Sequence, residues 1–317
     1  MEKKRIAFFD AKPYDRIWFD QLAPKYGYDI KYYEHKLTAD TALLTKNADA
    51  VVAFVNDDIG KDTIDALYGQ GVRVIAMRSA GYNNVDIKYA FEKIHILRVP
   101  AYSPHAVAEY AMALLLTLIR KTHKAYVRTR EHNFSINGLE GINLYGRTAG
   151  VVGTGKIGRI FIDICRGFGM HVIAYDPYPA ADSGIQYVSF EELCAQSDII
   201  SLHAPLTKET HHIIDAASIA AMKPNTVIVN TSRGALIDSR ALLDALRTRA
   251  IRGAALDVYE EETDVFFEDY SQEIMSDDIL TILISMPNVL ITSHQAFLTD
   301  EALQNWRAPQ SLNQFPS

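Results

Sequence analysis

The chain has 317 residues, of which 48% are hydrophobic and 22% charged, a balance typical of soluble globular proteins with room for two domains. The formal net charge of -7 argues against nucleic acid or an anionic membrane as the main partner, because both attract surfaces dense in lysine and arginine. The apolar run before Asp10 is too short for a signal peptide, and the longest apolar helix expected, 106–119, falls short of the ~20 residues that span a bilayer. We therefore expect a cytoplasmic protein.

The first third of the chain alternates short β-branched and aromatic runs with helical stretches, as in a parallel sheet covered by helices. Strands are expected at residues 4–10, 28–34, 50–55, 72–79 and 95–99. A second series follows at residues 148–153, 171–176, 199–203, 226–231, 253–257 and 288–292. We predict an α/β protein with two parallel sheets rather than one sheet of eleven strands.

The boundary between the two series is expected near Pro100 and Pro104, which bracket Ser103. Ser103 can cap a long apolar helix that begins at about His105 and is expected to pack between domains or subunits. After Phe297 the pattern predicts one more helix, which could return the chain to the first sheet. The first domain is thus predicted to be discontinuous. The two cysteines, Cys165 and Cys194, are expected to be buried free thiols, because they lack metal-ligand spacing.

A glycine-rich turn follows the strand at 148–153, with the spacing Gly153-x-Gly155-x-x-Gly158 and a helical pattern after it. Glycine permits a tight turn and close approach of the backbone to a pyrophosphate, and the helix N-terminus offers free N–H groups. We expect an adenine dinucleotide to bind here; the alternative is a purely structural glycine turn. Asp176, at the end of the next strand, is positioned to bind the ribose hydroxyls and to repel a 2'-phosphate, unless it only caps the turn before Pro177. NAD is therefore favoured over NADP.

Polar residues follow three later strands, at the sheet edge where parallel sheets bind ligands. They are Arg233, Glu262 in the segment after Asp257, and His294. Each has an ordinary explanation by itself: a surface ion pair, a solvated acidic run, a packed histidine. Together they suit hydride transfer between nicotinamide and a 2-hydroxy or 2-oxo acid. Arg233 would clamp the substrate carboxylate, His294 would exchange a proton with the carbonyl oxygen, and Glu262 would stabilise the imidazolium.

Several segments resemble those of the D-isomer-specific 2-hydroxyacid dehydrogenases, and within that family the fermentative D-lactate dehydrogenases of bacteria. The matching segments are RSAGYNNVD (78–86), VPAYSPHAVAEYAM (99–112), VVGTGKIGR (151–159), NTSRGALID (230–238), ALDVYEEE (255–262) and SHQAFLTDEAL (293–303). The resemblance implies two doubly wound domains. A Rossmann NAD-binding domain, residues 102–296, would be inserted into a flavodoxin-like substrate domain made of residues 1–101 and 297–317.

The resemblance also implies roles for single residues. Arg233, Glu262 and His294 would be the catalytic trio. Substrate contacts would come from the backbone of Ser79, Ala80 and Gly81 and from Tyr102 and Phe297. Cofactor contacts are expected from Gly153, Thr154, Gly155, Lys156, Ile157, Gly158, Asp176, His203, Ala204, Pro205, Thr231, Ser232 and Asp257, the last of these at the nicotinamide carboxamide. No metal site is expected.

An acidic and aromatic insert, residues 264–279, is similar to that of the D-lactate enzymes, although a solvent loop of variable length explains it as well. The resemblance thus implies an NAD-dependent D-lactate dehydrogenase that reduces pyruvate and forms a homodimer or homotetramer. The segment after residue 303, which contains Pro309, departs from the family pattern.

Three alternatives stay open. One is a D-2-hydroxyacid dehydrogenase for larger 2-oxo acids, such as 2-oxoisocaproate or phenylpyruvate. A formate dehydrogenase is disfavoured, because those relatives pair the histidine with glutamine where this chain has Glu262. The third is an NAD-sensing corepressor that binds partners instead of turning over metabolites. The preferred 2-oxo acid, the physiological direction and any allosteric effector are left open.

Overall fold

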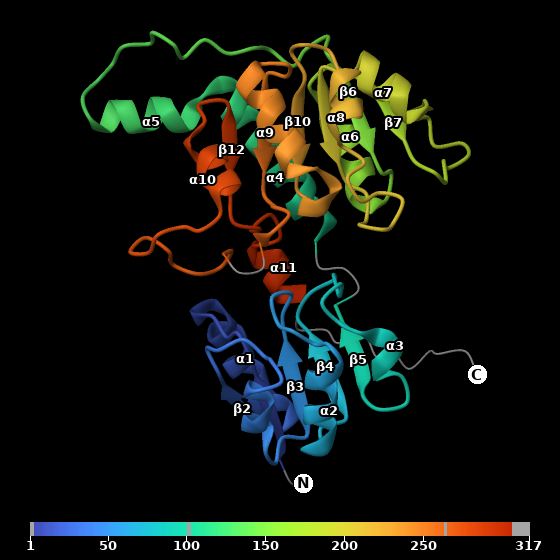
Figure 1. Ribbon diagram of the computed structural model, residues 1–317, viewed down its shortest axis with the longest axis vertical. Coiled ribbons are helices and arrows are strands. Elements are labelled where there is room, and N and C mark those ends of the chain that lie inside the picture. The colour runs from blue at the N-terminus through green and yellow to red at the C-terminus, as the bar shows by residue number, and fades with distance from the viewer. Residues whose placement is uncertain (1–2, 100–102, 263–264, 306–317) are drawn as a thin grey trace. The chain divides into compact units, whose positions relative to one another are not determined.

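The computed structural model describes residues 3–99, 103–262 and 265–305 (Figure 1). The chain divides into two compact units, one made of Met1–Ser103 with Leu298–Ser317 and the other of Pro104–Phe297. Each unit is built on its own parallel sheet, which confirms the predicted fold class. Tyr102 and the segment that contains Pro309 lie outside the described residues.

The first unit contains a five-stranded parallel sheet with the order β2-β1-β3-β4-β5, the flavodoxin-like arrangement. Its strands are β1 (Lys4–Phe8), β2 (Tyr28–Tyr32), β3 (Ala50–Ala53), β4 (Val74–Met77) and β5 (His95–Arg98). Its helices are α1 (Pro13–Tyr26), the 3-10 helix η1 (Thr41–Thr45), α2 (Lys61–Gly69), α3 (Ile87–Ala90) and, from the far end of the chain, α11 (Asp300–Asn305).

Helices cover both faces of this sheet, because parallel strands carry apolar side chains on both faces and each face needs an apolar partner. Ile64 and Leu67 of α2 pack in one core with Val51 and Ile75 of the sheet. On the opposite face, Phe19 of α1 lies 5.0 Å from Phe8, between ring centroids, in an edge-on contact. The sheet is thus closed on both sides, and the loops at its strand ends are left free to carry function.

The second unit contains a seven-stranded parallel sheet with the order β12-β11-β10-β9-β6-β7-β8. The strands are β6 (Thr148–Val152), β7 (His171–Tyr175), β8 (Gln186–Tyr187), β9 (Ile199–Leu202), β10 (Val227–Asn230), β11 (Gly253–Leu256) and β12 (Val289–Ile291). The chain first builds outward from β6 to β8 and then returns to β9 on the other side of β6. This reversal creates a topological switch point beside β6, the place where doubly wound sheets bind ligands.

The helices of the second unit lie on both faces of this sheet, except α5, which extends away from it (Figure 1). They are α4 (Pro104–Arg120), α5 (Thr122–Arg130), α6 (Lys156–Gly167), α7 (Phe190–Gln196), α8 (Ala216–Ala220), the 3-10 helix η2 (Gly234–Leu236), α9 (Ser239–Thr248) and α10 (Asp278–Ser285). Leu115 of α4 and Phe161 of α6 share one core with Val151 of the sheet. Leu193 of α7 and Leu243 of α9 belong to the core on the other face.

That α4 packs between domains or subunits stays a prediction. On its buried face, Ala108, Leu115 and five further side chains join the core of the second unit, against α6 and the sheet. The physical reason is that one whole face of the seven-stranded sheet needs an apolar cover, and α4 supplies much of it.

Strand β8 and helix α10 are among the elements that the sequence did not predict. Strand β8 has only two residues, too few for a periodic signal. Helix α10 lies at the end of the insert, where Asp277 caps it by accepting a hydrogen bond from the backbone N–H of Leu280 at 2.9 Å. No helix in the described part of the chain combines the length and apolarity needed to cross a bilayer.

Candidate active site

The glycine turn after β6 is shaped by two glycines at which a Cβ would overlap nearby backbone atoms. Gly153 has φ 91°, and a Cβ there would lie 2.8 Å from the backbone of His203. A Cβ on Gly158 would lie 2.0 Å from the carbonyl oxygen of Gly153. The turn therefore folds back on the first residues of α6 at a distance that only glycine allows.

The middle glycine of the turn, Gly155, has a different environment. It is the N-cap of α6, and a Cβ built on it would meet no atom within 4 Å. Open space thus lies beside the N-cap of a 12-residue helix, and free N–H groups at a helix N-terminus suit the pyrophosphate of a dinucleotide. At the end of β10, the hydroxyl oxygen of Thr231 is buried and has no hydrogen-bond partner among the described residues, so a cofactor can supply one.

Asp176, directly after β7, bonds to the glycine turn. One carboxylate oxygen accepts hydrogen bonds from the backbone N–H (2.7 Å) and the hydroxyl (2.9 Å) of Thr154, and the other accepts from the N–H of Tyr178 at 2.9 Å. Partial burial opposes ionisation, but these hydrogen bonds outweigh it and hold the pKa of Asp176 below its ordinary value. The carboxylate is therefore ionised at neutral pH, as repulsion of a 2'-phosphate requires.

His203 lies beneath the glycine turn. Its Nε2 lies 2.9 Å from the hydroxyl of Ser201, and its ring lies 5.0 Å from that of Phe161, between centroids. Burial lowers the pKa of His203 to about 3, so the imidazole is neutral at physiological pH. The geometry makes His203 a support for the turn. Its neighbour Ala204 accepts a hydrogen bond from the hydroxyl of Ser232 at 2.6 Å, which ties the ends of β9 and β10 together.

Glu262 and His294 are in direct contact, although 32 residues separate them in the chain. Nδ1 of His294 lies 2.7 Å from Oε1 of Glu262. The other carboxylate oxygen, Oε2, accepts a hydrogen bond from the backbone N–H of Tyr259 at 2.9 Å. The side chains of His294 and Glu262 are mostly buried, 17% and 15% exposed, so solvent screens the pair only in part. The carboxylate fixes the orientation of the ring and leaves Nε2 as the nitrogen that can serve a substrate.

Asp257 holds the segment that carries His294. Its fully buried carboxylate accepts hydrogen bonds from the hydroxyl of Thr292 (2.6 Å) and the backbone N–H groups of Gln295 (3.0 Å) and Ala296 (2.7 Å). Its own carbonyl oxygen accepts from the N–H of His294 at 2.7 Å. Burial raises the pKa of Asp257 above its ordinary value, against the effect of these hydrogen bonds. Asp257 is therefore a positioning residue for His294, whatever it contacts in the cofactor.

Arg233 follows β10, the neighbour of β11 in the sheet, so it belongs to the same carboxyl edge as Asp257. The side chain of Asn230 bridges the turn before it: its amide nitrogen donates to the carbonyl of Arg233 at 2.8 Å and its oxygen accepts from the N–H of Ser232 at 3.0 Å. A Cβ on Gly234 would lie 2.0 Å from the carbonyl of Tyr259. The backbone beside Arg233 is thus packed directly on the segment that leads to Glu262.

The predicted substrate contacts lie in different parts of the chain. Ser79, Ala80 and Gly81 follow β4 in the first unit, where the Ser79 hydroxyl donates to the carbonyl of Gly81 at 2.7 Å. Arg98 donates to the carbonyl of Ala80 at 2.8 Å. Phe297 is buried at the end of the second unit. Tyr102 lies outside the described residues.

Three neighbours of the site were not predicted from the sequence. Phe267, in the insert, places its ring 5.9 Å from that of His294, between centroids. Asn230 holds the turn before Arg233, and the sequence N-T-S-R-G already carries the signal of a side-chain-stabilised turn. Arg159 donates from Nε to the carbonyl of Thr154 at 2.9 Å and so brings a cation to the turn that Asp176 binds.

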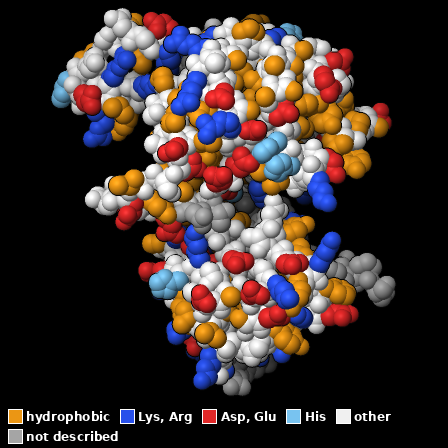
Figure 2. All heavy atoms as spheres, viewed as in Figure 1, with side chains coloured by type: hydrophobic (Ala, Val, Ile, Leu, Met, Phe, Trp, Pro, Cys, Tyr) orange, Lys and Arg blue, Asp and Glu red, His pale blue; other side chains and the backbone are white. Residues whose placement is uncertain are grey.

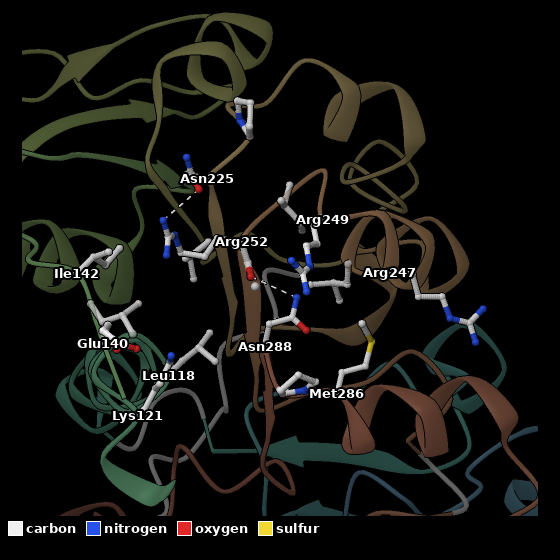
Figure 3. A pocket seen from close by; sticks show the side chains of 17 residues that line it. Leu118, Lys121, Glu140, Ile142, Asn225, Arg247, Arg249, Arg252, Met286 and Asn288 are labelled. Atoms are coloured by element: carbon white, nitrogen blue, oxygen red, sulfur yellow. Dashed lines mark hydrogen bonds between the residues drawn. The ribbon is translucent and has the colours of Figure 1, made fainter. Parts of the chain in front are cut away.

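A separate pocket of about 710 Å³ lies at the opposite edge of the second sheet. It is bordered by residues at the amino ends of β10, β11 and β12, among them Val227, Gly253 and Asn288. Figure 3 shows Arg252 bonded to the side chain of Asn225 (3.0 Å) and Asn288 bonded to the carbonyl of Arg252 (3.2 Å). Because the catalytic candidates stand at the carboxyl ends of these strands, this pocket is not the active site.

The second unit therefore combines a dinucleotide turn at a topological switch point with a histidine bonded to a carboxylate at the same edge of the sheet. These features define a nicotinamide-dependent dehydrogenase.

The comparisons with known proteins give the family. Residues 112–296 match the model of the D-isomer specific 2-hydroxyacid dehydrogenase NAD binding domain. The chain belongs to this family, as its motifs predicted, and its cofactor is NAD.

Relatives resemble the chain along nearly its whole length. It is 48% identical to a 2-hydroxyacid dehydrogenase homolog of Haemophilus influenzae, over 95% of this chain and 92% of the relative. It is 46% identical to the D-lactate dehydrogenase of Escherichia coli, over 94% of this chain and 92% of that one. Among solved structures, the pyruvate reductase of Chlamydomonas reinhardtii is similar with a TM-score of 0.90 and 41% identity, covering 96% of this chain and 93% of that chain.

Proposed function

We propose that the protein is an NAD-dependent D-lactate dehydrogenase that reduces pyruvate, with His294 as the general acid and base. The observation that carries the proposal is the 2.7 Å contact between Nδ1 of His294 and Oε1 of Glu262 on the NAD-binding sheet. Support comes from relatives whose names specify D-lactate or pyruvate and which match more than nine tenths of the chain.

The cofactor, when bound, supplies the hydride. The chain's own residues provide the proton and the orientation. His294, with Nδ1 bonded to Glu262, transfers a proton from Nε2 to the carbonyl oxygen of the 2-oxo acid and takes it back in the oxidation direction. The carboxylate of Glu262 stabilises the positive charge that the ring carries in its protonated form.

Arg233 is proposed to bind the substrate carboxylate, because its planar guanidinium can form two parallel charge-assisted hydrogen bonds. In the first unit, which we propose as the substrate domain, the backbone of Ser79, Ala80 and Gly81 is proposed to contact the same carboxylate. Phe297 and Tyr102 are proposed to contact the substrate's side chain.

Cofactor contacts are proposed from the glycine turn and the strand ends beside it. The first N–H groups of α6, at Lys156, Ile157 and Gly158, are suited to the pyrophosphate. The free hydroxyl of Thr231 needs a partner that the cofactor can provide. The remaining proposed contacts are Gly153, Thr154, Gly155, Asp176, His203, Ala204, Pro205, Ser232 and Asp257.

The test is steady-state oxidation of NADH by the purified protein with pyruvate, 2-oxoisocaproate and phenylpyruvate, with chiral analysis of the product. We expect the highest kcat/KM with pyruvate, and D-lactate as the product. A higher kcat/KM with either larger acid would move the assignment to another member of the family. Intact NADH binding without turnover of any 2-oxo acid would indicate a binding protein instead of an enzyme.

We further propose that the enzyme is a homodimer or homotetramer. The segment from α5 to β6 exposes apolar side chains that a monomer would leave in water: Tyr126 (61% exposed), Phe134 (74%), Ile136 (78%) and Tyr145 (82%). None of the described residues of α5 is buried. Such apolar exposure is typical of interaction surfaces, and we propose a second copy of the chain as the occupant.

We also propose that the protein works in the cytoplasm, on small metabolites rather than on nucleic acid or membranes. Cys165 and Cys194 are both buried and free, as expected in a reducing compartment. Fractionation of cells that express the chain tests the location: lactate dehydrogenase activity in a periplasmic or membrane fraction would contradict it.

A further inference from the structure

His211, His212 and Glu260 form a cluster of ligand-type side chains in the second unit. Each offers one ligand atom, and these three atoms lie within 4.8 Å of one another. Nε2 of His212 lies 2.5 Å from Oε1 of Glu260, and the centroids of the two imidazole rings are 3.9 Å apart. On the surface shown in Figure 2, histidine side chains lie beside acidic side chains within this unit.

Three backbone contacts hold the cluster in place. The N–H of His212 donates to the carbonyl of Ala235 at 2.9 Å, which joins the histidine pair to η2. The same η2 begins at Gly234, where a Cβ would lie 2.3 Å from the backbone nitrogen of Glu260. The N–H of His211 donates to the carbonyl of Thr207 at 3.0 Å. The ligand atoms are therefore presented by packed backbone rather than by a mobile loop.

The carboxylate of Glu260 is also held in its orientation by hydrogen bonds from Ser239. The second oxygen of Glu260, Oε2, accepts hydrogen bonds from the hydroxyl (2.9 Å) and the backbone N–H (3.3 Å) of Ser239. Carboxylates that bind metals are commonly fixed by such outer hydrogen bonds. His212 and Glu260 are partly exposed, with side chains 31% and 24% accessible, and His211 is exposed, so an ion can reach the cluster from solvent.

We propose that His211, His212 and Glu260 bind a divalent transition-metal ion, with Zn²⁺ as the best fit. Two imidazole nitrogens and one carboxylate oxygen are a typical zinc ligand set, with water in the fourth position. Tetrahedral ligands at about 2.0–2.1 Å from zinc are roughly 3.3 Å apart. The His212–Glu260 contact must therefore open by less than 1 Å (roughly 3.3 Å against 2.5 Å), and His211 must close in by a rotation of its exposed side chain.

The site is connected to the active site through the chain itself. Glu260 lies two residues before Glu262, and the N–H of Tyr259 bonds to the Glu262 carboxylate at 2.9 Å. Movement of Glu260 toward a metal would therefore displace the segment 259–262, whose Glu262 orients His294. Zinc occupancy is therefore expected to change turnover.

Binding is tested first, on the full-length protein after removal of metals, by Zn²⁺ titration against a chromophoric chelator. We expect one equivalent per chain in the wild type. His211→Ala and Glu260→Gln should each weaken that binding at least tenfold. His171→Ala, which removes an exposed histidine elsewhere in the same unit, should leave it unchanged. Co²⁺ in place of Zn²⁺ should show the intense visible absorption of tetrahedral coordination in the wild type, and His211→Ala should lose it.

His294→Ala separates this site from the other histidine–carboxylate pair. The variant should retain the zinc equivalent, and its loss would place the ion at the active site and overturn the proposal. Wild-type affinity in His211→Ala would overturn it as well.

A kinetic experiment, which rests on the proposed function, compares kcat for pyruvate with and without Zn²⁺. A change of threefold or more in kcat is expected in the wild type and not in His211→Ala. Full occupancy at an unchanged rate would overturn the link to Glu262, and the binding titration would stand independently of it.

Discussion

The imidazole of His294 has one nitrogen bonded to a carboxylate and one nitrogen left for chemistry, and its backbone is held in the left-handed region at φ 52°. Histidine tolerates that conformation better than most residues, yet it still carries strain of about 1 kcal/mol or more. The hydrogen bond from its N–H to the carbonyl of Asp257 offsets this strain. The ring is thus pre-oriented before any substrate arrives.

We expect His294→Ala to lower kcat for pyruvate by about 10²–10⁴-fold, the usual contribution of a positioned general acid. The dissociation constant for NADH, measured by fluorescence titration, should stay within about twofold, because no proton is moved in binding. Glu262→Gln is the matched variant: it keeps a hydrogen-bonding group but loses the charge, and should show a smaller loss. Equal losses in kcat and NADH affinity would contradict the role of His294 as the acid.

Arg233→Lys should raise the KM for pyruvate by about 10- to 100-fold while the affinity for NADH is kept, because an ammonium group cannot form the two parallel hydrogen bonds of a guanidinium. Initial rates over a range of pyruvate concentrations measure this. Arg252→Lys, at the other edge of the sheet, is the control. A near-normal KM in Arg233→Lys would refute the carboxylate clamp.

Asp176→Ala should reduce the preference for NADH over NADPH, since the ionised carboxylate that repels the 2'-phosphate is removed. Arg159 provides a second test. Its side chain bonds to the same glycine turn, so in Asp176→Ala it would remain to attract the 2'-phosphate of NADPH. In the double variant with Arg159→Ala, the gain in NADPH use should shrink. The measurement is the ratio of kcat/KM for NADH to kcat/KM for NADPH. An unchanged ratio in Asp176→Ala would mean that another residue discriminates between the two cofactors at the ribose.

At the scale of elements, the turn between β6 and α6 separates two roles that glycine can have. Gly153 and Gly158 are required by close backbone contacts, whereas Gly155 has room for a side chain and a φ of -66° that any residue adopts. The first two serve the fold and the third leaves space for the ligand.

Gly158→Ala should therefore destabilise the protein by about 1–3 kcal/mol or more, because its Cβ would overlap the backbone of Gly153. Gly155→Ala should keep the melting temperature and weaken NADH binding, since its methyl group enters the open space at the helix N-terminus. Thermal unfolding and NADH titration of both variants separate the two effects. Normal NADH affinity in Gly155→Ala would show that the pyrophosphate binds elsewhere.

At the scale of the whole molecule, each sheet is buried by helices on both faces, so the cores of the two units account for most apolar side chains. The segment around α5 exposes several aromatic and aliphatic side chains close together in the chain, from Tyr126 to Tyr145. Exposed apolar area of this kind is costly in water and is relieved by association.

The double variant Phe134→Asp/Ile136→Asp should shift the protein toward the monomer, because two charges would be buried in the proposed interface. Light scattering coupled to size-exclusion chromatography measures the mass. Ile274→Asp, at an exposed position in the insert, is the control for surface charge. An unchanged oligomer in the double variant, or a monomeric wild type, would contradict the proposed surface.

Much of the fold could be predicted because its signals are local. The strands of both sheets lie where apolar runs of β-branched residues occur, and the glycine spacing predicts the turn at Gly153. Strand β8 and helix α10 were missed, since two residues carry no period and the cap at Asp277 lies within an acidic insert.

The sequence by itself determined the fold class, the cofactor turn and the residue types of the candidate site, because periodicity and glycine spacing are properties of neighbouring residues. Only the tertiary structure decided which further distant groups meet: Phe267 with the imidazole of His294, Arg159 with the turn at Thr154, and Glu260 with His212. The physical reason is that these contacts depend on how parallel strands are ordered in the sheet and where their loops end, and hydrogen bonds act only over a few ångströms.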